Sequence, residues 1–241
     1  MTKPIAHSIS GKGLYFIASL EMPNAKPALK AIKSVESNKD GSDKYEIGFG
    51  HNSDDFFTVE KDTVVTEKKA KELLKHDVEE SEQQFNAFIK KHNLKFIQHE
   101  YDALISAMYN GVPVTNEKMG IGKAAINCGH LIDNIKAFAE DFKFSNKIGK
   151  GGLNKYAKKT TDQKWKCFEY KRDVRFQREN ARTTLVKELK RWVYYTNSNK
   201  KLISNGLQNR REAEARLFLN GDYQENPNRG PIFEWVTLSG E

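Results

Sequence analysis

Two short segments near the N-terminus constrain the fold of this chain more than any other feature. In the first, Leu14, Ile17, Ala18 and Glu21 recur at intervals of one, three and four residues, as on one face of a helix. In the second, Tyr45–His51, glycines alternate with apolar residues in a run that is typical of a β-strand. A helix followed by such a strand predicts an α+β fold with a small sheet near the N-terminus.

The two faces of this strand differ in bulk. Because side chains alternate along a strand, one face is expected to carry large side chains, namely Tyr45, Ile47, Phe49 and His51. The other face carries Glu46 and, after it, Gly48 and Gly50, which add no side-chain bulk. Glycines in a strand often mark the close approach of a ligand or another backbone. A turn-rich edge strand is the alternative interpretation.

Glu21 and Glu46 form a candidate pair of acids. Glu21 continues the apolar stripe of its helix, so it is expected to face the core or a cleft. Glycoside hydrolysis uses two carboxyl groups that flank the bond to be cleaved. The structural alternative for Glu21 is a boundary residue whose carboxylate stays in water, since glutamate is rarely fully buried.

The order of these segments resembles the start of the phage-type lysozymes, the endolysins of glycoside hydrolase family 24. The matching segments are Leu20-Glu21-Met22, the strand Glu46–His51, a helix at Thr66–Val78, a central helix at Tyr101–Gly111, and a closing segment at Trp192-Val193 and Gly206–Glu214. Together they cover roughly residues 11–110 and 183–220. The resemblance implies a mostly helical α+β fold, a lysozyme-like two-lobed domain with a small β-hairpin or sheet near the N-terminus and a helical C-terminal lobe.

The same resemblance implies roles for individual residues. Glu21 corresponds to the general acid, and Arg210 corresponds to the arginine that lies beside it, whereas Arg211 could equally be an ordinary residue of the first helical turn. Glu46 stands where the family usually has threonine, so we expect it to take over or share the role of the base. The side chains expected to support the site or bind substrate are Tyr45, His51, Asn110 and Arg210, with a structural histidine as the alternative for His51.

The second catalytic carboxylate has several candidates besides Glu46. The spacing usual in the family selects Asp40. A shift of three residues would select Asp43 instead, and the long segment after Glu21 also allows Glu36. All three lie in or near a polar turn, where aspartate is commonly a turn former. No metal ligand and no cofactor are expected.

Composition is that of a globular protein, with 241 residues, 38% hydrophobic and 30% charged. This length allows one substantial domain or two small lobes. The sequence contains no run of about 18 apolar residues, so no membrane span is expected. The N-terminus lacks the apolar core of an ordinary signal peptide, so Cys128 and Cys167 are expected to be free thiols.

Positive charge is concentrated in one segment. Residues 143–191 hold 16 Lys and Arg against 5 Asp and Glu, within a net charge of +8. Aromatic residues are interleaved there, namely Trp165, Phe168, Tyr170 and Phe176. The pattern is compatible with nucleic-acid binding, with a solvated helical surface, or with attraction to an anionic cell wall, which the family resemblance favours.

Apolar periodicity predicts the remaining elements. We expect a helix at 11–21, a turn at 38–43, strands at about 44–50 and 56–59, and a helix capped by Thr66. Further helical stripes begin at Tyr101, Leu131 and Leu185, and Asn209 with Glu212 predicts a capping box for the last helix. We expect a single lysozyme-like domain over residues 1–241, with a catalytic helix and β lobe at 11–65, a helical lobe at 66–222 that contains a basic insertion at about 145–182, and a tail at 223–241.

These observations predict a peptidoglycan muramidase that cleaves the bond between N-acetylmuramic acid and N-acetylglucosamine. It would be a phage endolysin or a secreted antibacterial effector, made in the cytoplasm without a signal peptide and acting on the cell wall after release. A catalytically impaired wall-binding or spike module is the alternative, and a basic nucleic-acid binder is a weaker one. Peptidoglycan is the expected substrate. An inhibitor, immunity protein or delivery protein is a conceivable partner, and no nucleic acid is expected. The chain is expected to be a monomer.

Overall fold

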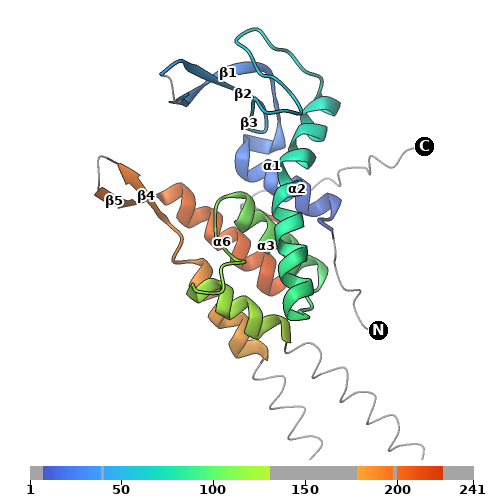
Figure 1. The fold of residues 1–241 in the computed structure, drawn as a ribbon, viewed down its shortest axis with the longest axis vertical. Helices are drawn as coiled ribbons and strands as arrows, with labels where there is room; N and C mark the ends of the chain where they lie inside the picture. Colours follow the sequence, from blue (N-terminus) through green and yellow to red (C-terminus); the bar gives the residue numbers. More distant parts are fainter. Residues whose placement is uncertain (1–7, 39–40, 131–177, 198–199, 225–241) are drawn as a thin grey trace, which may run out of the picture.

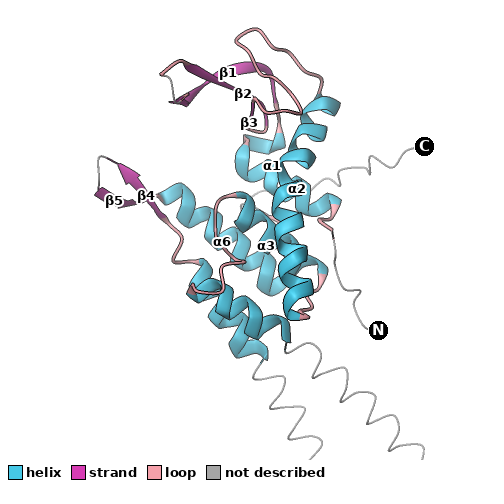
Figure 2. Cartoon of the chain, viewed as in Figure 1, coloured by secondary structure: helices cyan, strands magenta, loops and turns pink. Residues whose placement is uncertain are grey.

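The computed structural model describes residues 8–38, 41–130, 178–197 and 200–224. The α-helices are α1 (Gly11–Glu21), α2 (Glu67–His92), α3 (Gln98–Tyr109) and α6 (Asn205–Asn220), with helical stretches also at residues 120–130 and 178–189. A short 3-10 helix, η1 (Pro23–Ala25), follows α1. The strands are β1 (Ala28–Ser37), β2 (Asp43–Gly48), β3 (His51–Asn52), β4 (Tyr194–Asn197) and β5 (Lys200–Ile203). Figure 2 shows that these strands gather in two places, and the rest of the described chain is mainly helical. The predicted fold class is confirmed.

The long helix α2 connects the small sheet to the helical lobe (Figure 1). Thr66 caps its first turn by accepting a hydrogen bond from the Lys69 amide, as the sequence predicts. Its buried face is the predicted stripe, namely Ala70, Leu73, Leu74, Val78, Phe85, Phe88 and Ile89. Twenty-six residues of helix span about 39 Å, so one rigid element reaches from the sheet to the core of the helical lobe.

The sheet near the N-terminus has three antiparallel strands in the order β1-β2-β3. The predicted turn at 38–43 joins β1 to β2, where the Asn38 amide donates to the Ser42 carbonyl. The predicted strand at 44–50 ends early, because Gly48 and Gly50 have positive φ and turn the chain into β3. The strand predicted at 56–59 is wrong, since those residues have no regular structure.

The strand β1 was not predicted, and its side chains explain why. Leu29 and Ile32 are both exposed, at 41% and 43%, so β1 lacks the alternation of buried apolar and exposed polar residues that identifies a half-buried strand. It forms because its backbone pairs with β2 on one side, while the Ala31 amide donates to Thr63 across the other.

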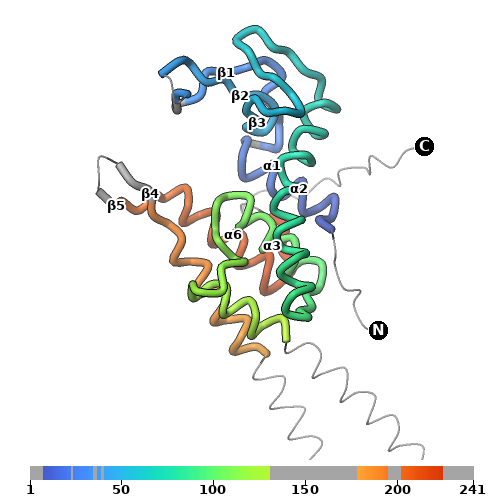
Figure 3. Tube along the Cα trace, in the orientation of Figure 1, coloured from blue at the N-terminus to red at the C-terminus, as the bar shows by residue number. Residues whose placement is uncertain are grey.

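The helical lobe is built around α3 and α6, which pack against each other; the tube in Figure 3 follows these green and red segments side by side. The stretch at 178–189 adds Leu185 and Leu189 to the core. The predicted capping box at Asn209 is wrong: α6 begins earlier, after Ser204, whose side chain accepts from the Leu207 amide. The predicted stripe that begins at Leu131 lies outside the described residues, as does most of the basic insertion.

The start of α1 is fixed to α3 through a buried acid. Ser10 caps α1 by accepting from the Gly13 amide, and its own amide and hydroxyl donate to Asp102, which is fully buried on α3. These bonds set the position of α1, and therefore of Glu21 at its other end. Among the described helices, none is long and apolar enough to cross a membrane. Cys128 is a buried free thiol, while Cys167 lies outside the described residues.

Candidate active site

Glu21 is the last residue of α1, and the chain then passes through η1 into β1 of the sheet, which lies above α1 in Figure 1. The turn of helix before it is anchored in the core, because Ile17 and Ala18 are fully buried. The carboxylate itself is not fully buried, with 25% of the side chain exposed. The structure therefore combines a rigid backbone with a carboxyl group that a substrate can reach.

Arg210 on α6 lies against this carboxylate. Its Nη1 donates to Oε1 of Glu21 at 2.5 Å, and only 8% of the Arg210 side chain is exposed. A planar guanidinium with several fixed donors can hold a carboxylate in one orientation. The contact that the family resemblance implied is present, and it joins residues at opposite ends of the described chain.

A second carboxylate, Glu214, lies on the other side of Arg210. Glu214 is fully buried and accepts hydrogen bonds from Nε of Arg210 at 3.2 Å and from the Ser106 hydroxyl at 2.9 Å. Nη1 of Arg211 lies 2.8 Å from its other oxygen. No role was predicted for Glu214, although its spacing of three and four residues from two arginines is a signal for contacts within one helix.

Burial and charge oppose each other in this cluster. Burial raises the pKa of Glu214, and the charges of Arg211 and Arg210 offset only part of this upward shift. Burial raises the pKa of Tyr109, on α3, above its ordinary value, and the charges of Glu21 and Asp77 raise it further, so the phenol stays neutral well above physiological pH. The neutral phenol therefore lies near two acids, in the region where α1, α2 and α3 meet.

Glu46 occupies the middle strand of the sheet. It pairs with Ile32 of β1 on one side and with Asn52 of β3 on the other. Directly paired residues in antiparallel strands share a face, so Glu46, half-buried, lies on the face that also carries exposed Ile32. The neighbouring Ile47 is fully buried on the opposite face. The predicted separation of Glu46 from the packed face is confirmed.

The other candidate acids are placed as follows. Asp40 lies outside the described residues, and so does the side chain of Glu36. Asp43 is exposed at the start of β2 and pairs with Lys33 at 2.6 Å, so it stabilises the hairpin. Tyr45 lies on β2, the middle strand, and is partly buried against the core.

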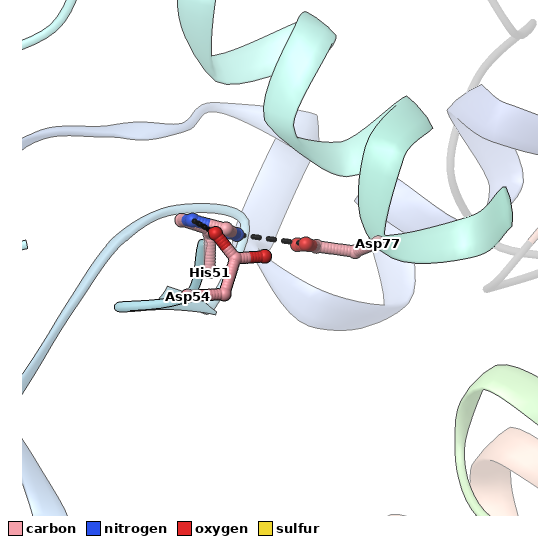
Figure 4. Close-up of side chains that lie close together, drawn as sticks. All are labelled: His51, Asp54 and Asp77. Atoms are coloured by element: carbon pink, nitrogen blue, oxygen red, sulfur yellow. Dashed lines mark hydrogen bonds and ion pairs between the residues drawn. The ribbon is translucent and has the colours of Figure 1, made fainter. Parts of the chain in front are cut away.

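His51 connects the sheet to α2, as Figure 4 shows. Its Nδ1 lies 2.7 Å from Oδ1 of Asp77 on α2, and its Nε2 lies 3.4 Å from the Phe57 carbonyl and 3.6 Å from Asp54. Burial lowers the pKa of His51, but the hydrogen bond and the charge of Asp77 raise it more, so the net shift is upward. These contacts favour the structural interpretation of His51. Both ring nitrogens face oxygen atoms, and the shortest of these contacts is the ion pair with Asp77.

Asn110 ends α3 and lies between the acid cluster and a neighbouring pocket. Its side-chain oxygen accepts a hydrogen bond from Nη2 of Arg211. The pocket has a volume of about 590 Å³, and its lining includes Asn110, Met119, Glu188, Trp192 and Tyr194. Asn110 is four residues after Ser106 on α3, so the pocket begins about one helical turn from the cluster around Arg210.

Part of this chain matches a curated phage protein. The endolysin of Bacillus phage B103 is 29% identical over 147 residues, which are 59% of this chain and 47% of that protein. The chain thus spans about half the length of this curated relative.

Two solved structures share the fold. One is the endolysin from Escherichia coli O157:H7 phage FAHEc1, with a TM-score of 0.55 and 21% identity over 92% of this chain and 99% of that one. The other is the muramidase domain of SpmX from Asticaccaulis excentricus, with a TM-score of 0.52 and 19% identity over 89% of this chain and 99% of that one. The family described as phage lysozyme matches residues 33–155, about half of the sequence, a stretch that begins after Glu21 and ends before Arg210. On this match, the chain belongs to the phage lysozyme family.

Proposed function

We propose that this protein is a peptidoglycan muramidase that hydrolyses the β-1,4 bond between N-acetylmuramic acid and N-acetylglucosamine. The observation that carries the proposal is the pairing of Glu21 with Arg210 at the end of α1, in a chain of the phage lysozyme family. Both solved neighbours bear names of wall-degrading proteins, an endolysin and a muramidase domain. We therefore place its action at the bacterial cell wall.

In the proposed reaction Glu21 is the general acid. Its carboxyl group gives a proton to the glycosidic oxygen as the bond from that oxygen to the anomeric carbon breaks. A water molecule adds to the anomeric carbon, and its proton passes to the second carboxylate. Glu46 is the candidate for this role on the described face of the sheet, and Asp40 is the candidate from the hairpin turn. The pocket beside Asn110 offers room for a part of the substrate next to the cleaved bond.

The proposal is tested by a Glu21→Gln variant in a turbidity assay on purified peptidoglycan, with reducing sugar measured in the same samples. Glu212→Gln is the matched control, because Glu212 is exposed on α6 and pairs with Lys190. We expect Glu212→Gln to clear the suspension like the wild type and Glu21→Gln to lose clearing almost completely. Equal clearing by Glu21→Gln would contradict the proposal.

A catalytically impaired wall-binding module is the second candidate, favoured by the half-buried Glu46 at a position where the family usually has threonine. This candidate predicts that wild-type protein sediments with peptidoglycan and releases no reducing sugar. The muramidase proposal predicts both sedimentation and release.

A further inference from the structure

The arginine that contacts Glu21 is shared with a second acid. Arg210 donates through Nη1 to Glu21 and through Nε to Glu214, so one guanidinium lies between two carboxylates. Glu214 is held in place from α3 by the Ser106 hydroxyl, and Arg210 also donates to the Ser106 carbonyl at 3.4 Å. The geometry of the proposed acid therefore depends on a buried group on its far side.

The position of Glu214 matters because the two tasks of the site, holding Glu21 in place and keeping a proton available, oppose each other. A general acid must hold a proton, whereas an adjacent guanidinium favours the ionised carboxylate. An arginine beside a general acid therefore opposes proton donation unless its positive charge is offset. The buried carboxylate of Glu214, on the far side of Arg210, offsets part of the positive charge of Arg210. A negative charge on one carboxylate also disfavours ionisation of another carboxyl group nearby.

We propose that Glu214 is a positioning residue that orients Arg210 against Glu21 and offsets the positive charge of Arg210. This inference rests on the proposed muramidase function. It assigns to Glu214 a role through Arg210, without contact to the substrate. Its exposed fraction of 0%, its two hydrogen-bond donors and its ion pair with Arg211 are what such a role requires, because they hold the carboxyl group in one place out of contact with water.

The charged and titratable groups around these two acids come from three helices. On α6 they are Arg210 and Arg211, and the charge of Glu21 also acts on Arg211. On α3, Tyr109 lies near Glu21, and on α2, Asp77 acts on the same phenol. The phenol is neutral over the working range, so it does not compete with Glu214 in setting the balance of charge around Arg210.

The test is a double-mutant cycle of Glu214→Gln, Arg211→Gln and the combined variant, read out as the pH profile of kcat. Removing the Glu214 charge should move the alkaline limb to lower pH by on the order of one pH unit. Removing the Arg211 charge should move it to higher pH, and the combined variant should lie between the two. Glu212→Gln, exposed on the same helix, is the control and should leave the profile unchanged.

A structural role for Glu214 would lower activity at every pH without moving the limb, and this result would overturn the inference. Thermal unfolding followed by circular dichroism identifies any variant that fails to fold. If Glu214→Gln alone is unfolded, the Arg211→Gln and combined variants still decide, because the inference requires opposite effects of the two charges.

A second measurement separates this inference from the proposed function. The Glu21 carboxyl signal can be followed by ¹³C NMR against pH in wild type and variants, without any substrate. A shift of its titration midpoint in the directions given above supports the inference even if the wild type releases no sugar. An unchanged midpoint in Glu214→Gln would refute it even if the enzyme is active.

Discussion

Arg210 and Glu21 are 189 positions apart in the sequence, and their side chains meet at 2.5 Å. The contact brings the last helix of the helical lobe to the residue from which the chain enters the sheet. It closes the structure around a carboxylate that stays partly accessible. Both the stability of the lobe contact and the chemistry proposed for Glu21 therefore depend on one guanidinium.

Replacing Arg210 by Gln is expected to lower kcat about 100-fold, because a misplaced catalytic group loses about that factor. The same change leaves Glu214 with one arginine fewer in a fully buried site, which should cost about 3–5 kcal/mol of unfolding free energy. Steady-state kinetics and chemical denaturation measure the two effects. Lys190→Gln removes an exposed pair on the same lobe and should change unfolding by less than about 1 kcal/mol. Wild-type kcat in Arg210→Gln would contradict the expectation.

Glu46→Gln is expected to lower kcat by about 10²- to 10⁴-fold if Glu46 is the proposed base, with little change in stability because the residue is half-buried on the open face of the sheet. Asp40→Asn, measured in parallel, identifies the alternative base. The anomeric configuration of the first product, read by NMR, reports whether the second carboxylate acts on water or on the sugar. Full activity of Glu46→Gln would exclude Glu46 from the reaction.

The ion pair between His51 and Asp77 predicts a pH-dependent stability. Burial lowers the pKa of His51, but Asp77 raises it more, so the folded protein holds the proton to higher pH than the unfolded chain does. The stabilisation is fully present below the unfolded pKa, near 6.5, and is lost as pH rises through the folded value. Asp77→Asn should therefore lower the unfolding free energy by roughly 1.5–3 kcal/mol below the unfolded pKa of His51. The loss should be smaller above the folded pKa of His51. A cost that does not vary between pH 5 and 9 would contradict this origin.

Gly48→Ala should destabilise the protein more than Gly41→Ala does. Both glycines have positive φ, +67° and +82°, so each substitution costs roughly 1–2 kcal/mol of backbone strain. At Gly41 an added Cβ meets nothing within 4 Å, whereas at Gly48 it lies 3.3 Å from the Cβ of Ala70 on α2. The difference between the two unfolding free energies isolates the contact between the sheet and α2. Equal losses of unfolding free energy in the two variants would show that α2 moves away from the added methyl group without a measurable cost.

Much of the fold could be predicted from periodicity. The buried stripe of α2 was predicted residue by residue, and so was its Thr66 cap, because a long helix with one apolar face repeats its signal over several turns. The sheet was predicted less well, since β1 exposes Leu29 and Ile32 and is held by its backbone pairing. Such a strand carries no pattern in its side chains.

The sequence by itself determined the family and the position of Glu21 at the end of an apolar helical face, because both depend on residues that are close together along the chain. The family resemblance had already placed Arg210 beside that acid, and the tertiary structure decided which further residues surround the pair. Arg210, Glu214 and Ser106 meet only because α1, α3 and α6 pack together, which brings charges into a buried site where water cannot screen them. The contacts of His51 with Asp77 and of Asn110 with Arg211 also arise from packing, so the roles of these side chains could not be read from spacing alone.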